Sequence, residues 1–86
     1  MPHVTIYTRP YCGYCARALD LLERKGVEFT EIEAGFDPEK RQEMMRRSGR
    51  TTFPQIFVGD THIGGCDDMM ALERAGKLDP LLKTAA

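Results

Sequence analysis

Two cysteines stand three residues apart in the segment Cys12-Gly13-Tyr14-Cys15. Only a thiolate attacks a disulfide, and an ordinary cysteine is mostly a neutral thiol at neutral pH. Cys12 lies where the loop after a predicted strand turns into a predicted helix, and the unpaired N–H groups and positive dipole of a helix N-terminus favour an anion there. Arg9, three residues earlier, adds a positive charge that favours the same form. The pattern therefore predicts a nucleophilic thiolate at Cys12.

Cys15 follows one helical turn later, on the same face of the predicted helix as Cys12. We expect the two sulfurs close enough to form a disulfide, with Cys15 deeper and nearer the core. In thiol–disulfide exchange one cysteine attacks and a second resolves the mixed disulfide. We predict that Cys12 is the nucleophile and that Cys15 is the resolving cysteine.

The alternative interpretation is that the cysteine pair forms half of a zinc site. Structural zinc needs about four ligands, so two more would have to come from elsewhere in the chain. The other candidate ligands are Cys66, His3 and His62, which do not form a second close pair. His62 and Cys66 have a plausible spacing, but Gly64-Gly65 lies between them. The strand–helix–strand context favours a redox pair, so we predict no metal ligands.

Whole-chain composition limits the class of protein. The 86 residues predict one small domain over 1–86, and 42% hydrophobic with 29% charged residues is ordinary for a globular protein. A net charge of −1 gives no sign of a nucleic-acid partner, and no apolar run approaches the roughly 18 residues of a membrane span. The start of the chain lacks the pattern of a secretory signal, and three cysteines fit a secreted disulfide framework poorly. We expect a cytoplasmic protein without nucleic-acid or membrane partners.

Hydrophobic periodicity predicts the elements that position the cysteine pair. Strands are expected over 3–7, 27–33, 55–58 and 61–63. Helices are expected over 12–25, 38–48 and 67–75, with one more short helical turn from Asp79-Pro80. The order β-α-β-α-β-β-α predicts an α/β fold with a mixed four-stranded sheet flanked by helices. Its first half is a parallel strand pair with a right-handed crossover, and its second half adds a hairpin.

Three segments together match a family pattern: 8–15 with the cysteine pair, Arg50-Thr51-Thr52-Phe53-Pro54-Gln55-Ile56-Phe57, and His62-Ile63-Gly64-Gly65-Cys66-Asp67-Asp68. The sequence resembles the dithiol glutaredoxins, especially small bacterial members with a third cysteine after a Gly-Gly pair. The resemblance implies a thioredoxin-like fold and glutathione as cofactor. It also implies reduction of protein–glutathione mixed disulfides and of protein disulfides.

The resemblance implies that two segments bind glutathione. Thr52-Phe53-Pro54 matches the family's loop with a cis proline, where the Phe53 backbone would face the cysteine of glutathione. From the residues alone, Pro54 would instead begin an edge strand. Gly65, Cys66 and Asp67 match the site for the γ-glutamyl end, where helix N–H groups meet a carboxylate and Asp67 accepts from the α-amino group. From the residues alone, the acidic pair is an ordinary N-cap. Three roles of Cys66 stay open. We favour a contact to the ligand through its backbone alone; the others are a buried small hydrophobic residue and an oxidation-prone thiol.

Side chains outside these segments complete the implied groove. Arg9 and Arg41 match positions that hold the glycine carboxylate of glutathione, because a guanidinium donates two bonds to a carboxylate at once. For Arg41, a solvated helix face is an equally good interpretation. Tyr14 would form one wall of the groove. We expect His62 on the hairpin surface, and we expect surface charge at Lys40, Arg46, Arg47 and Arg50.

Gly13 and Phe53 depart from the common family pattern, which has Pro and Val at these positions. Gly13 loosens the start of the helix. Family members without that proline are more often the ones that hold a 2Fe–2S cluster between two subunits, with glutathione completing the ligands. The resemblance therefore leaves two possibilities open. One is a monomeric enzyme whose partners are glutathione and glutathionylated or disulfide-containing proteins, and the other is a cluster-bridged dimer.

Overall fold

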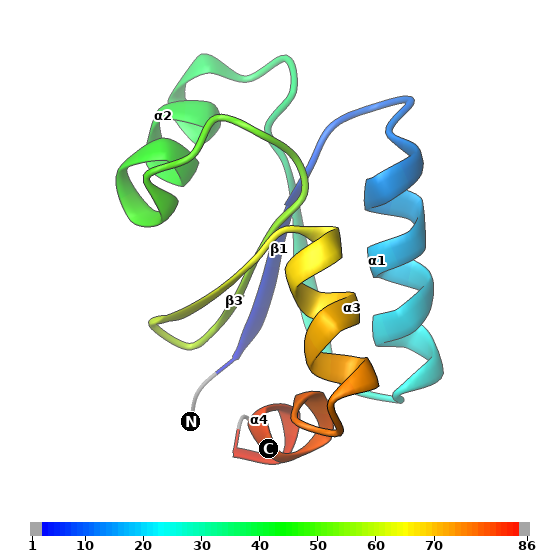
Figure 1. The fold of residues 1–86 in the computed structure, drawn as a ribbon. Helices are drawn as coiled ribbons and strands as arrows, with labels where there is room; N and C mark the ends of the chain where they lie inside the picture. The colour runs from blue at the N-terminus through cyan, green and yellow to red at the C-terminus, as the bar shows by residue number, and fades with distance from the viewer. Residues whose placement is uncertain (1–2, 85–86) are drawn as a thin grey trace.

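A four-stranded sheet forms the centre of the computed structural model, which describes residues 3–84 (Figure 1). Its strands are β1 (Val4–Thr8), β2 (Phe29–Glu33), β3 (Gln55–Val58) and β4 (Thr61–Gly64), in the spatial order β2-β1-β3-β4. β1 is parallel to β2 and antiparallel to β3, which is antiparallel to β4. The predicted mixed sheet is confirmed. The terminal residues 1–2 and 85–86 of the predicted domain lie outside the described part.

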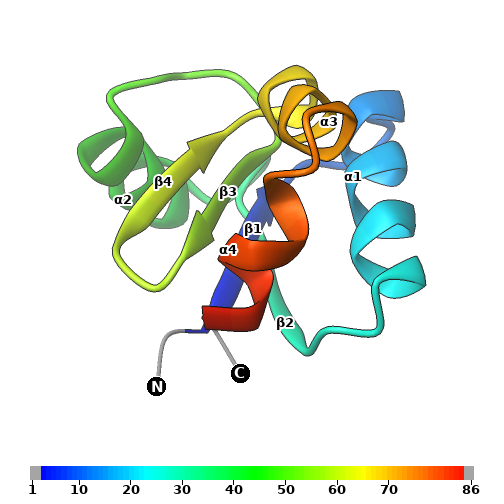
Figure 2. The same ribbon diagram turned by 60° about the horizontal axis from the view of Figure 1, so that its bottom comes forward.

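Four helices cover the sheet within residues 3–84: α1 (Gly13–Arg24), α2 (Pro38–Ser48), α3 (Cys66–Arg74) and α4 (Leu78–Thr84). Figures 1 and 2 show α1 and α3 on one face of the sheet and α2 on the other, with α4 across one end. The sequence predicts only a helical turn from Asp79-Pro80. The structure has a seven-residue helix there, because Leu78 and Leu82, one helical turn apart, are both buried in the core. Between residues 3 and 84, no helix has the length and apolarity needed to cross a membrane.

Each face of the sheet carries its own hydrophobic cluster, because successive strand side chains point to opposite faces. Val4 and Ile6 pack with α1, α3 and α4 in the larger cluster. Tyr7 and Phe57 pack with Met44 of α2 in the smaller one. Burial of this apolar surface is the main force that holds the helices on the sheet and so positions their N-termini.

Local signals set most of the element ends. The Asp37 carboxylate accepts hydrogen bonds from the backbone of Glu39 and Lys40, which confirms the predicted N-cap of α2. The second strand begins at Phe29 and not at residue 27 as predicted. The reason is register: Val4, the first residue of β1, lies opposite Phe29.

Arg47 has a structural position that the sequence does not predict. Its guanidinium lies 4.1 Å from the centroid of the Phe57 ring and donates to the Tyr7 hydroxyl at 2.8 Å. The same hydroxyl donates to Glu43 at 2.5 Å, and burial, followed by this carboxylate, raises the pKa of Tyr7. Arg47 is exposed, in agreement with the predicted surface charge, and its side chain in addition ties α2 to the sheet.

Candidate active site

Cys12 is the N-cap of α1, in the loop that follows β1, with an extended backbone. Its Sγ atom accepts a hydrogen bond from the backbone N–H of Cys15 at 3.2 Å and lies 4.0 Å from the Phe53 carbonyl oxygen. Only 8% of the residue is exposed. The sulfur thus lies at a helix N-terminus, where backbone N–H groups stabilise an anion, and beside the loop that precedes β3.

Cys15 lies within α1 and is more deeply buried than Cys12, with 3% of the residue exposed. Burial, followed by the hydrogen bond with Cys12, raises the pKa of Cys15 to about 12. Both cysteines, together with Cys66, are free thiols. At neutral pH Cys15 must lose a proton before it attacks, so the two thiols of the motif are chemically unequal.

A groove of about 490 Å³ runs beside Cys12, within the size range of small-molecule sites. Three parts of the chain form it: the start of α1 with the loop before it, the loop before β3, and the N-terminus of α3. It contains every predicted ligand-contact residue except Arg41. Its lining residues are Arg9, Tyr14, Arg50, Thr51, Thr52, Phe53, Pro54, Gly65, Cys66, Asp67 and Asp68.

Two loops meet closely at the floor of this groove. The Phe53–Pro54 peptide bond is cis, as predicted. A Cβ atom on Gly65 would lie 3.3 Å from the Pro54 carbonyl oxygen, and one on Gly64 would lie 2.3 Å from Asp68 Oδ2. Gly64 also has a φ of 122°, which side chains disfavour. The Gly-Gly pair is therefore needed for the approach of the hairpin to α3.

Asp68 and Arg50 are groove residues that the sequence analysis does not assign to the site. The Asp68 carboxylate accepts from the Gly65 N–H at 2.9 Å and from the Arg50 guanidinium at 2.8 Å. The Arg50 bond, followed by the Gly65 bond, lowers the pKa of Asp68. Arg50 is exposed, in agreement with the predicted surface charge, and it also forms this ion pair at the groove. Its place directly before Thr51-Thr52-Phe53-Pro54 was the available signal.

Arg41 is exposed on α2, and its guanidinium donates to the Gly35 carbonyl. It is not among the residues that line the groove. This position matches the alternative interpretation of a solvated helix face, and the ligand role of Arg41 stays a prediction. Arg9, in contrast, lines the groove and is also exposed.

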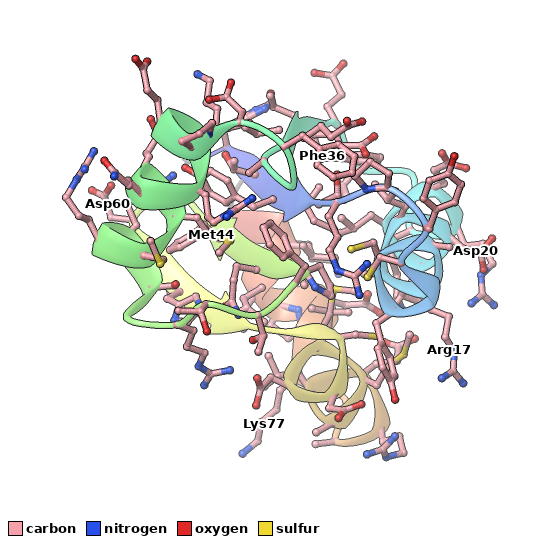
Figure 3. All side chains as sticks on the ribbon, turned by 90° about the horizontal axis from the view of Figure 1, so that it is seen from above. Arg17, Asp20, Phe36, Met44, Asp60 and Lys77 are labelled. Carbon is pink, nitrogen blue, oxygen red and sulfur yellow. The ribbon has the colours of Figure 1, made fainter. Side chains whose placement is uncertain are left out.

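Cys12 lines a second hollow, of about 430 Å³, formed by the end of β1, the loop after it, the first turns of α1 and β2. Cys15, Thr8 and Glu31 line it, and Arg9 belongs to both hollows. The fully exposed Tyr11 borders the same hollow. Figure 3 shows sulfur atoms beside the start of α1, with the exposed Phe36 on a neighbouring loop. Cys12 therefore lines this hollow and lies next to the first groove through its contact with Phe53.

Comparison with known proteins assigns this arrangement to a family. The family model described as glutaredoxin matches residues 4–63. The chain belongs to the glutaredoxin family. Glutaredoxins are glutathione-dependent thiol–disulfide oxidoreductases, which agrees with a pair of free, unequal thiols beside a ligand-sized groove.

Curated relatives cover nearly the whole glutaredoxin. A glutaredoxin of Pseudomonas aeruginosa is 61% identical over 82 residues, which cover 95% of this chain and 98% of the relative. Glutaredoxin 3 of Escherichia coli is 57% identical over 83 residues, which cover 96% of this chain and 100% of the relative.

Solved structures of other glutaredoxins have the same fold, which confirms the predicted thioredoxin-like architecture. The solution structure of a Brucella melitensis glutaredoxin is 65% identical, with a TM-score of 0.85 and coverage of 100% of this chain and 94% of that chain. A buckwheat glutaredoxin–glutathione complex is 32% identical, with a TM-score of 0.87 and coverage of 98% and 79%. A structure titled "Metal Binding of Glutaredoxins" is 64% identical, with a TM-score of 0.73 and coverage of 100% and 94%.

Proposed function

We propose that this glutaredoxin reduces protein–glutathione mixed disulfides and protein disulfides through the segment Cys12-Gly13-Tyr14-Cys15. The observation that carries the proposal is the position of the Cys12 sulfur at a helix N-terminus, 4.0 Å from the Phe53 carbonyl oxygen of a ligand-sized groove. It acts as a monomer in the cytoplasm, where the reducing environment keeps such thiols from forming permanent disulfides.

Glutathione carries two carboxylates and one ammonium, and the groove offers complementary groups to all three. The N–H groups at the start of α3, at Cys66 and Asp67, suit the γ-glutamyl carboxylate, and the Asp67 side chain suits the α-ammonium. The Phe53 backbone suits main-chain pairing with the cysteine of glutathione. Arg9 suits the glycine carboxylate. The buckwheat complex supports glutathione as the ligand of this groove.

Removal of glutathione from a protein needs Cys12 alone. The Cys12 thiolate attacks the glutathione sulfur of the mixed disulfide, the protein–glutathione S–S bond breaks, and the protein thiolate leaves and takes up a proton from water. The thiolate of a second glutathione then attacks the glutathione sulfur held on Cys12. Glutathione disulfide leaves, and the Cys12 thiolate is restored.

Reduction of a protein disulfide also needs Cys15. Cys12 attacks one sulfur of the substrate, and Cys15, after losing its proton, attacks Cys12 and releases the reduced protein. The Cys12–Cys15 disulfide is then reduced by two glutathione molecules, which leave as glutathione disulfide. The spacing of one helical turn and the hydrogen bond between Cys12 Sγ and the Cys15 backbone support this closure.

A glutathione-coupled assay on two substrates tests this division of work: a glutathionylated peptide and a protein disulfide. Cys12→Ser is expected to lower both activities by about a thousandfold or more, because no nucleophile remains. Cys15→Ser is expected to keep the first activity and lose the second. Equal loss of both activities in Cys15→Ser would contradict the assigned roles.

A cluster-bridged dimer is the second candidate, and two observations favour it. A Cβ atom on Gly13 would have nothing within 4 Å, so the space next to Cys12 at the helix start is open. A 64% identical structure is titled "Metal Binding of Glutaredoxins". Residues 3–84 of one copy contain no group of three or more metal-ligating side chains. Cys12 from two copies and two glutathione sulfurs would supply the four thiolates that a 2Fe–2S cluster needs.

Visible absorption and size-exclusion chromatography of anaerobically purified protein test the dimer. Gly13→Pro is the matched variant, because proline is tolerated at the first residue of a helix. We expect the wild type, with Gly13, to form a coloured dimer and Gly13→Pro to stay a colourless monomer. A colourless wild-type monomer after reconstitution with iron, sulfide and glutathione would exclude the second candidate.

A further inference from the structure

Gln55, the first residue of β3, connects the groove loop to the β3–β4 hairpin and is fully buried. Its side-chain nitrogen donates to the Thr52 carbonyl oxygen at 3.0 Å and to the Thr52 hydroxyl oxygen at 3.1 Å. Its side-chain oxygen lies 2.7 Å from Nε2 of His62 on β4. One buried amide therefore links Thr52 to His62.

The Thr52 carbonyl determines the direction of these bonds, because a carbonyl only accepts. The nitrogen of the Gln55 amide must face Thr52, so the amide oxygen faces His62. Nε2 of His62 must then carry a hydrogen and donate it. The His62 ring is held in place by stacking on Phe57, with ring centroids 4.8 Å apart and planes 30° apart.

Thr52 directly precedes the part of the loop that meets the active thiol. The Phe53 carbonyl oxygen lies 4.0 Å from Cys12 Sγ, and Thr52, Phe53 and Pro54 all line the groove. Hydrogen bonds to its polar groups restrict the backbone of a loop to one conformation. A change in the orientation of the Gln55 amide should therefore alter the position of the loop backbone at Phe53, next to Cys12.

We propose that Gln55 and His62 are positioning residues for glutathione. His62 orients the Gln55 amide, and the Gln55 amide holds Thr52, so that the Phe53 backbone is preorganised for the ligand. Neither side chain is among the residues that line the groove. The inference rests on the proposed binding of glutathione in this groove and adds a second layer of residues behind it.

Two substitutions separate the hydrogen bond from ring packing. His62→Phe keeps a ring on Phe57 and loses the donor. His62→Gln loses the ring and places an amide N–H where Nε2 was. The probe is S-methylglutathione, which has no reactive sulfur, titrated into each full-length protein by calorimetry. His3→Phe is the matched control, since His3 bonds Thr30 on the neighbouring strand β2.

We expect His62→Phe to weaken binding by about 3- to 10-fold, the usual effect of one lost hydrogen bond. His62→Gln and His3→Phe should bind within about twofold of wild type. With a glutathionylated peptide, His62→Phe should raise KM and leave kcat within about twofold. The backbone amide resonance of Phe53 should shift in His62→Phe and not in His62→Gln.

The reverse order, with His62→Gln weaker than His62→Phe, would show that the ring only packs and would overturn the inference. Equal binding by all variants would also overturn it, while leaving the proposed groove intact. Failure of wild type to bind S-methylglutathione would overturn the groove assignment itself, and the inference with it. Thermal unfolding of each variant before titration excludes loss of the fold as the cause.

Discussion

The Asp68 carboxylate and the Arg50 guanidinium form an ion pair of 2.8 Å that joins two walls of the groove beside Cys12. Arg50 belongs to the loop before β3, and Asp68 belongs to the first turn of α3. The same carboxylate oxygen accepts the Gly65 N–H. One side chain thus caps the helix whose N-terminus is proposed to bind glutathione and also holds the opposite loop.

Replacing Asp68 and replacing Arg50 should lower the free energy of unfolding by unequal amounts. About half of each side chain is exposed, so the ion pair alone should contribute well under 1 kcal/mol. Asp68→Ala also removes the cap on Gly65 and should cost about 1 kcal/mol or more, whereas Arg50→Ala should cost less. Urea denaturation measures both, with the exposed Asp60→Ala as control. A larger loss in Arg50→Ala would show that the pair, not the cap, stabilises this end of α3.

Gly64 should tolerate no side chain. Its φ of 122° and the approach of Asp68 leave no room for a methyl group, so Gly64→Ala should cost about 1–3 kcal/mol. In an Asp68→Ala background the cost should fall by at least about 0.5 kcal/mol, because the two nearest atoms are gone. Urea denaturation of the four proteins measures this coupling. Gly13→Ala, where a Cβ would have nothing within 4 Å, should lose no stability.

Acid should destabilise the fold in two steps. Burial and then the nearby Arg50, with a smaller effect of Arg47, lower the pKa of His62 below its ordinary 6.5, while Asp68 opposes them. The pKa of Asp68 is likewise below its ordinary 3.8. For both groups the unfolded chain takes up the proton first, so stability is complete above the unfolded pKa and is lost as pH falls through the folded one. The free energy of unfolding should therefore fall below about pH 6.5 and again below about pH 4.

Urea denaturation at about pH 7.5, 5.5, 4 and 2.5 measures both steps. His62→Gln should remove most of the loss between pH 7.5 and 5.5, because the amide does not titrate there. His3→Gln is the matched control and should keep that loss. An unchanged pH dependence in His62→Gln would assign the first step to other groups.

Closure of the Cys12–Cys15 disulfide should accelerate with pH. Burial is the largest cause that raises the pKa of Cys15, and it persists when Cys12 carries a mixed disulfide. Only a small fraction of Cys15 is then ionised at neutral pH, and this fraction rises about tenfold per pH unit below the pKa. Stopped-flow release of a thiol from a mixed disulfide on Cys12 should therefore show a rate that climbs steadily from pH 6 to 9. A rate independent of pH would mean that another group takes the Cys15 proton. Cys15→Ser, which cannot close, gives the baseline.

Several site features follow from short stretches of sequence. The position of Cys12 at a helix N-terminus, the Asp37 cap and the strand alternation of Val4, Ile6 and Tyr7 all depend on residues within about one helical turn or one strand. Physical interactions at that range are nearly independent of the rest of the fold, so the pattern predicts them directly. Comparison with a family pattern was needed to bring the three separate segments of the groove together.

Tertiary structure alone decided the contacts between distant segments. Arg50 meets Asp68 across 18 residues, and His62 is half-buried against Phe57 and Gln55, where the sequence predicts a surface residue. Arg41 lies outside the groove lining. The His62 contacts depend on the register of β3 and β4, because a shift of one residue would turn its side chain to the opposite face of the sheet. The contacts of Arg50 and the position of Arg41 depend on how a loop and two helices pack on that sheet. The sequence by itself determined the position of Cys12 at the start of its helix, and the packing on the sheet decided which side chains surround it.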